Sequence, residues 1–296
     1  VESGVDLRQG VSGVKVSGGT TPHVSFEHAG NIHDVACRLL VGADGRTSTV
    51  RRQLGIAMQE APLDHLIVGL LLDGADDWPQ DLQSTGKFGD LHYLVFPQGG
   101  GKVRIYGDYA YDGKARFNGE NGAQELLAAF DIDRVPHSKA IANARPIGPC
   151  QSFPSQDAWV DAPCVEGAVL IGDAAGYNDP ILGQGLSVTL RDSRTVAELL
   201  TGGERWQPSL FTPYIEERRE RLRRLRFVAS FVTTLNARFR ADDVKRRAGA
   251  FQRMAEDPGM FGIVLAAFSG PETLPAEYFT EAFYAKAFGT TEHLVA

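Results

Sequence analysis

Residues whose types and spacing suit a bound cofactor gather between positions 168 and 200. The apolar run Ala168-Val169-Leu170-Ile171 ends at Gly172-Asp173, and a loop rich in Gly, Asn and Pro follows it. Apolar residues then recur at helical spacing from Leu186 to Leu200. The stretch therefore predicts a buried strand, a loop and the start of a helix.

The loop has residue types that a ligand site needs. Its glycines expose backbone to a bulky ligand, and they are Gly172, Gly176, Gly183 and Gly185. Pro180 stiffens the bend between them. Asp173 directly follows the strand, where open α/β sheets place ligands, and its carboxylate can accept hydrogen bonds from sugar-like hydroxyls. The alternative for Asp173 is an ordinary turn or N-cap residue.

The beginning of the helix offers a place for negative charge. Backbone amides at Gly185, Leu186 and Ser187 open it, and the partial positive charge of a helix N-terminus favours an anion. A reduced flavin ring is one such anion.

A similar arrangement occurs earlier in the chain. Val35 to Val41 is interpreted as one mostly buried strand, which leads into Gly42-Ala43-Asp44-Gly45. Thr47 or Ser48 can then cap a short helix that runs to Leu54. A strand that simply ends in an Asp-Gly turn is the alternative interpretation.

These two stretches resemble the flavin-binding motifs of the FAD-dependent aromatic hydroxylases, the family that includes para-hydroxybenzoate hydroxylase. The second motif is matched by Gly172-Asp173-Ala174-Ala175, then by Pro180 and Gly183-Gln184-Gly185-Leu186. Many members carry His at the position of Gly176, so the chain departs from the pattern there. The other motif is matched by the GADG sequence followed by Ser48 and Arg51. By this resemblance Asp44 helps arrange the flavin pyrophosphate and the approach of the nicotinamide cofactor, and Gly45 supports the turn.

The resemblance implies an α/β fold, α+β overall. An FAD-binding Rossmann-like domain carries an inserted antiparallel β-sheet substrate domain and C-terminal helices. The expected division is 1–60 and 151–201 for the FAD-binding domain, 61–150 for the substrate domain and 202–296 for the helices. Family members hold the pyrophosphate with a GxGxxG unit ahead of the first motif, and none occurs before position 44. We therefore expect an incomplete FAD-binding domain, in which an added amino-terminal unit restores flavin binding.

The middle of the chain has the texture of a sheet. Strands are expected at Leu66 to Leu72, His92 to Phe96 and Val103 to Tyr109, with a hairpin loop from Pro97 to Lys102. The resemblance makes this sheet a roof over the flavin, with the substrate beneath it. The candidates for facing the substrate are Tyr93, Phe96, Arg104 and Tyr106.

Composition limits the kinds of partner. The 296 residues are 43% hydrophobic and 23% charged, as in ordinary globular proteins, and no apolar run approaches the ~18 residues of a membrane-spanning helix. A net charge of −7 argues against nucleic acid as a partner. Three widely spaced cysteines indicate reduced thiols in a cytoplasmic protein, and the histidines show no zinc spacing.

The carboxyl-terminal part is interpreted as helical. Pro208 to Arg240 has apolar residues at three-and-four spacing, which predicts one long helix. Its many arginines allow phosphate binding, but the i,i+4 pairs Glu217–Arg221 and Glu220–Arg224 favour a solvated, salt-bridged face. Further helices are expected at Asp243 to Glu256 and Pro275 to Phe288.

The resemblance implies an FAD-dependent monooxygenase that uses NAD(P)H and O2. A flavin hydroperoxide would transfer one oxygen atom to an aromatic or other electron-rich small molecule. A geranylgeranyl-reductase-like flavin enzyme is the alternative, because Phe96-Pro97 matches its roof strand, although His92 and Leu94 replace the expected Tyr and Trp. The isolated tryptophans argue against a flavin halogenase. A non-enzymatic remnant or interaction module without flavin is the third interpretation.

Overall fold

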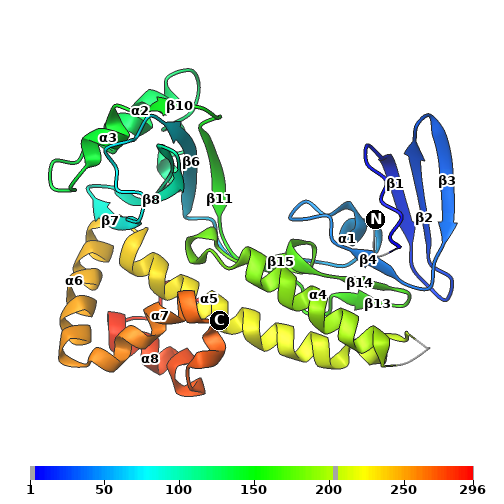
Figure 1. Ribbon diagram of the computed structural model, residues 1–296. Coiled ribbons are helices and arrows are strands. Elements are labelled where there is room, and N and C mark those ends of the chain that lie inside the picture. Colours follow the sequence, from blue (N-terminus) through cyan, green and yellow to red (C-terminus); the bar gives the residue numbers. More distant parts are fainter. Residues whose placement is uncertain (1–3, 203–205, 296) are drawn as a thin grey trace. The chain divides into compact units, whose positions relative to one another are not determined.

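The computed structural model describes residues 4–202 and 206–295, and the chain divides into two compact units (Figure 1). The first unit takes its residues from within 1–60, 157–178 and 183–223. The second takes them from within 61–156, 179–182 and 224–296. Helix α5 (Thr212–Asn236) contributes its beginning to the first unit and its end to the second.

The first unit contains three small sheets. An antiparallel sheet consists of β1 (Ser12–Ser17), β2 (His23–His28) and β3 (Asn31–Ala36). A mixed sheet has the order β13 (Cys164–Val165), β14 (Ala168–Leu170) and β4 (Leu40–Gly42). The third has the order β15 (Gly176–Tyr177), β12 (Ala158–Trp159) and β5 (Gln59–Glu60). The helices α1 (Thr49–Gln53) and α4 (Gly185–Thr201) follow the first and second motifs.

The prediction of one buried strand from Val35 to Val41 is wrong. The segment belongs to two sheets, because β3 ends at Ala36 and β4 begins at Leu40. Val35 and Val41 are 43% and 44% exposed. The apolar run therefore marks a crossing between two short strands. In contrast, Ser48 caps α1 as expected, since its hydroxyl accepts a hydrogen bond of 2.9 Å from the Arg51 amide.

The second unit is built on a six-stranded sheet. Its main path runs β10 (Arg145–Pro146), β6 (His65–Asp73), β9 (Lys102–Ala110), β8 (Leu91–Gly99) and β7 (Ser84–Phe88), and β11 (Gln151–Ser155) also pairs with β6. The hairpin loop is shorter than the predicted Pro97 to Lys102. Strand β8 continues to Gly99, and the turn is closed by Gly100 and Gly101, whose positive φ angles of 59° and 71° suit a tight reversal.

The two faces of this sheet differ in character. Alternate residues of the strands, among them Leu70, Val95 and Ile105, are buried in a core with α2 (Gly122–Ala129) and α3 (Ser138–Ala142). The residues between them point to the other face, because successive side chains of a strand alternate. That second face carries the side chains discussed below.

Helices complete the second unit: α6 (Ala241–Glu256), α7 (Gly262–Ser269) and α8 (Glu281–Phe288). The helix predicted from Pro275 to Phe288 is interrupted, because Thr280 ends a 3-10 turn and caps α8 with its side chain. The rings of Phe279 and Phe283 pack against Phe227 and Phe231 of α5, with centroid separations of 5.8 and 6.1 Å. None of the helices in the described ranges is long and apolar enough to cross a membrane.

We expect Leu70→Ala to destabilise the second unit. The Leu70 side chain is fully buried in the sheet core, so its truncation should lower the free energy of unfolding by about 3 kcal/mol. Ile32→Ala is the control, because Ile32 is 84% exposed and its loss should change that free energy by less than about 0.5 kcal/mol. Urea unfolding followed by circular dichroism measures both. Equal effects of the two substitutions would contradict the assigned core.

Candidate cofactor site

Parallel pairing of β4 with β14 brings the two sequence motifs together. Leu40 pairs with Ala168 and Gly42 with Leu170, so both strands end at the same edge of the sheet. A Cβ atom on Gly42 would lie 2.5 Å from Leu170 Cδ2 and 2.8 Å from Val50 Cγ1. Glycine is therefore required for the strands and α1 to approach one another.

The first turn uses its carboxylate to hold α1. Asp44 Oδ2 accepts hydrogen bonds from the amides of Thr49 at 2.7 Å and Val50 at 3.0 Å, and Oδ1 accepts one from the Ser48 hydroxyl. Partial burial opposes ionisation, but the hydrogen bonds from Ser48, Val50 and Thr49 outweigh it and lower the pKa of Asp44. Gly45 next to it has a φ of 79°. The Asp-Gly turn thus has a structural task, and the predicted part of Asp44 in cofactor binding stays a prediction.

The second turn lies beside the first. Gly172 has a φ of 58°, and a Cβ there would approach Thr189 Oγ1 to 2.8 Å. Asp173 keeps a third of its side chain exposed, and its Oδ2 lies 3.6 Å from Arg46 Nε. Arg51 Nη1 donates a hydrogen bond of 3.0 Å to the carbonyl of Ala174. Side chains of the first motif therefore contact the second motif directly.

The departure at Gly176 has a steric reason. Gly176 pairs with Trp159 in the β15–β12 ladder and has a φ of 108°. A Cβ atom would lie 2.6 Å from both Ala158 O and Trp159 Cα. No side chain fits there without displacing β12, so this chain could not place a histidine at that point.

The start of α4 leaves backbone open to a ligand. A Cβ on Gly183 or Gly185 would meet nothing within 4 Å, and Leu186 is 71% exposed. Ser187 is also exposed, and the side chain of the N-cap residue Gln184 makes no capping hydrogen bond to this helix. Pro180 begins the short 3-10 turn Pro180–Leu182 upstream of it. The first amides of α4 can therefore receive an anionic group.

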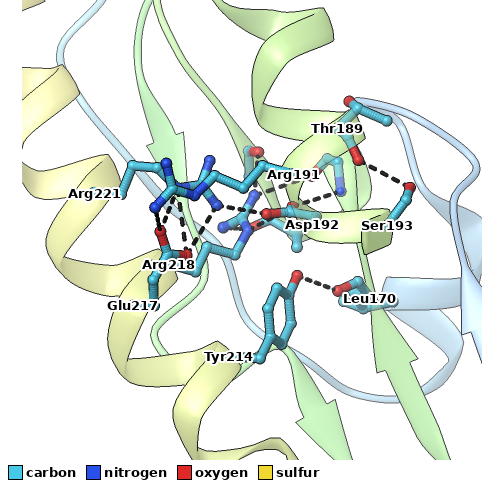
Figure 2. A network of polar contacts seen from close by, with 12 residues as sticks. Leu170, Thr189, Arg191, Asp192, Ser193, Tyr214, Glu217, Arg218 and Arg221 are labelled. Atoms are coloured by element: carbon cyan, nitrogen blue, oxygen red, sulfur yellow. Dashed lines mark hydrogen bonds and ion pairs between the residues drawn. The ribbon is translucent and has the colours of Figure 1, made fainter. Parts of the chain in front are cut away.

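A buried ion network holds the second turn from behind, as Figure 2 shows. Asp192 of α4 is fully buried; its Oδ2 accepts hydrogen bonds from the Gly172 amide and Arg218 Nε, both at 2.9 Å. Its Oδ1 accepts one of 2.7 Å from Arg221 Nη2. Arg218 also donates to the carbonyls of Ala175 at 2.8 Å, Gly172 at 3.1 Å and Gly176 at 3.0 Å. One guanidinium thus satisfies carbonyls along the whole turn.

The prediction of a solvated arginine face is wrong for part of α5. Arg218 and Arg221 are 1% and 7% exposed, because they face Asp192 rather than water. The predicted Glu217–Arg221 pair is confirmed at 3.1 Å, and Arg223 pairs with Glu220 at 2.8 Å on the outer side. Sequence reasoning did not identify Asp192 as the buried partner of these arginines. The sequence does contain a sign of this role, because Asp192 lies four residues from each of the buried Val188 and Val196 and so shares their helix face.

The proposed substrate residues of the second unit divide between the two faces of its sheet. Phe96, Arg104 and Tyr106 lie on the second face, where the rings of Phe96 and Tyr106 meet edge to face at 6.0 Å. Tyr93 points to the opposite face and packs edge-on against Phe130 in the core. The cause is the strand alternation of β8, so Tyr93 does not join the other three.

Two features shape the second face around Tyr106. Gly69 on β6 pairs with Tyr106, and a Cβ there would lie 3.0 Å from the tyrosine ring. The glycine therefore makes room for this ring. Arg104 forms no ion pair within the described part of the chain and is half-buried beside Phe96, its partner on β8.

Comparison with known proteins identifies the family. Residues 4–227 match the FAD binding domain family, so the chain belongs to it, and FAD is the cofactor of this family. The chain is 25% identical over 188 residues to digeranylgeranylglycerophospholipid reductase 2 of Methanopyrus kandleri, covering 60% of this chain and 44% of that protein. It is 26% identical over 221 residues to the mitochondrial ubiquinone biosynthesis monooxygenase COQ6 of Schizosaccharomyces pombe, covering 63% and 46%. The chain thus spans less than half of either relative.

A solved structure confirms the fold class. The flavin-dependent brominase Bmp2 superposes with a TM-score of 0.69 at 17% identity, covering 97% of this chain and 71% of that one. The likeness extends beyond the FAD family match into the carboxyl-terminal helices. The mixed α/β fold of a flavoprotein is therefore established.

We expect Arg218→Lys to destabilise the first unit. A lysine keeps the charge but cannot reach Asp192 and three carbonyls at once, so buried oxygens lose their donors. The free energy of unfolding should fall by about 3 kcal/mol. Arg223→Lys is the matched control on the same helix, since its pair with Glu220 is partly exposed and should matter little. Chemical unfolding measures both, and an unchanged midpoint for Arg218→Lys would contradict the network.

Proposed function

We propose that the protein is an FAD- and NAD(P)H-dependent monooxygenase, which inserts one oxygen atom of O2 into an aromatic or other electron-rich small molecule. The observation that carries the proposal is the meeting of both motif turns at one edge of the β4–β14 sheet, linked by Arg46 and Asp173. The FAD family match supports the cofactor. The likeness to COQ6, a monooxygenase by name, supports the reaction.

The donor set of the first unit fits FAD. Asp173 offers a partly exposed carboxylate to sugar hydroxyls at a strand's carboxyl end. The amides of Gly185, Leu186 and Ser187 offer donors to a negative group, with no side chain in the way at Gly183 or Gly185. Gly172, Ala174 and Gln184 shape the backbone between these groups, and Asp44 with Gly45 supports the neighbouring turn.

In this proposal FAD supplies the redox and oxygen chemistry, and the chain supplies placement and charge. The α4 amides stabilise negative charge without having to reorganise, because the helix is already fixed by Asp192 and Arg218. On the substrate sheet, Phe96 and Tyr106 offer an aromatic surface. Arg104 beside them offers a cation for an acidic group of the substrate.

A second candidate is a flavin-dependent reductase of polyprenyl lipids. The likeness to the digeranylgeranylglycerophospholipid reductase of M. kandleri favours it. The second face also favours it, because the apolar side chains of Leu94 and Phe96 lie there together, two residues apart on β8. The two candidates differ in what they consume, because a hydroxylase takes up O2 in proportion to product and a reductase saturates a double bond without O2.

The test begins with retention of the cofactor. The chain is mixed with FAD, passed through gel filtration and examined for a flavin absorption band, both alone and extended by an amino-terminal GxGxxG unit. A flavin-loaded protein is then given NADH or NADPH with simple phenols or with a geranylgeranyl lipid, under air and under nitrogen. Oxygen uptake coupled to phenol hydroxylation supports the monooxygenase, whereas anaerobic lipid reduction supports the second candidate. An extended chain that holds no flavin would contradict both.

We expect Asp173→Asn to weaken FAD binding while leaving the fold intact. The substitution removes the charge that pairs with Arg46 and accepts from hydroxyls, so the Kd for FAD should rise about tenfold. Glu198→Gln on the exposed side of α4 is the control and should leave the Kd unchanged. Flavin fluorescence titration measures both. An unaltered Kd in Asp173→Asn would remove this residue from the site.

A further inference from the structure

A buried group of charged side chains lies in the second unit. His65 at the start of β6 is 2% exposed and lies between two carboxylates. Its Nδ1 is 2.7 Å from Asp64 Oδ1, and its Nε2 is 3.2 Å from Asp179 Oδ2. The Nε2 contact is not aligned as a hydrogen bond, so it is an ion pair.

More charges face the same imidazole. Asp108 on β9 is fully buried and adds its negative charge, while its Oδ2 lies 2.6 Å from His92 Nδ1. Its other oxygen has no hydrogen-bond partner within the described ranges. Arg238 forms an ion pair with Asp64. We call Asp64, His65, Asp108, Asp179 and Arg238 the His65 cluster.

The carboxylates of this cluster favour a cation at its centre. Asp64 and Asp179 flank the imidazole of His65, and Asp108 adds its negative charge. Burial disfavours a charged imidazole, but Asp179, Asp64 and Asp108 outweigh it and raise the pKa of His65 to about 10. Because the folded-state pKa is raised, the stabilisation is complete below about pH 6.5, the ordinary value for His, and fades as the pH approaches 10.

The cluster ties the Asp179–Leu182 segment to the six-stranded sheet within the second unit. Asp179 directly precedes Pro180 in the second flavin motif. Its Oδ2 faces His65, and its Oδ1 accepts a hydrogen bond of 2.9 Å from the Ile181 amide. One oxygen of the Asp179 carboxylate therefore binds the backbone of its own segment, and the other pairs with His65, the first residue of β6.

We propose that His65, as an imidazolium, is a positioning residue that fixes the Asp179–Leu182 segment of the cofactor loop to the substrate sheet. The ion pair fixes this segment before FAD binds, which lowers the cost of ordering it on binding. The effect on FAD affinity rests on the proposed function, whereas the charge and the fixing of the segment do not.

The first test needs no cofactor. Nuclear magnetic resonance of the chain with labelled histidine follows the charge of His65 from pH 6 to 9, and hydrogen exchange follows the Ile181 amide. We expect a protonated imidazole up to pH 8 and slow exchange of the amide. Asp179→Asn keeps an oxygen for that amide but removes the charge, so exchange should become about tenfold faster. A neutral imidazole at pH 7, or unchanged exchange in Asp179→Asn, would overturn the proposal.

The second test measures how this fixed segment affects the affinity for FAD. We expect His65→Gln and Asp179→Asn each to raise the Kd for FAD about tenfold, and the double variant to do no more than either. His23→Gln is the matched control, because it removes an exposed histidine that lies 3.4 Å from Asp34. Additive effects in the double variant would contradict the ion pair as their common cause.

The two tests separate the inference from the proposed function. If His65→Gln does not fold, Asp179→Asn alone still gives the exchange and affinity results. If the wild-type chain holds no FAD, either alone or extended by an amino-terminal GxGxxG unit, the proposed function fails. The charge of His65 and the exchange of the Ile181 amide then decide on their own whether the loop is fixed.

Discussion

The parallel pairing of β4 with β14 is the constraint on which the proposed cofactor site depends. Each strand is only three residues long, yet their register places the turn after β4 and the turn after β14 at the same edge of the sheet. The approach is close enough that Gly42 has no room for a side chain. A slip of one residue would rotate every side chain to the other face and separate Asp173 from Arg46.

The turn after β14 could not keep its shape from local interactions alone. Its backbone carbonyls point into the protein, where an unsatisfied carbonyl is costly. Arg218 and Arg51 supply the donors, and Asp192 neutralises the buried guanidinium. A buried ion pair is costly to form and more costly to break, so it fixes one arrangement of the turn. Asp192 lies on α4 and Arg218 on α5, and both lie behind the turn, so the first amides of α4 stay accessible to a ligand.

Much of this organisation could be predicted from the sequence. The apolar runs and Gly-Asp turns located β14, α4 and the short helix after Asp44, because such patterns depend on neighbouring residues. The split between β3 and β4 could not be predicted, since each strand is short and its partners lie far along the chain. The burial of Arg218 was missed for the same reason. An arginine near glutamates looks solvated until the position of Asp192 is known.

Sequence reasoning also could not predict which face of a strand enters the core. Alternation along β8 separated Tyr93 from Phe96, but only the packing of α2 determined which of them entered the core. The charge on His65 likewise depends on three carboxylates from separate segments of the chain. No local pattern contains that information.

The central claim is that the two turns and the start of α4 form one FAD site. The most direct measurement is the change in backbone amide resonances of the isotopically labelled chain, extended at its amino terminus, on addition of FAD. The account predicts the largest shifts at Gly45, Asp173 and Gly185 to Ser187, with little change in the exposed β3. Saturable FAD binding that leaves these amides unchanged would contradict it.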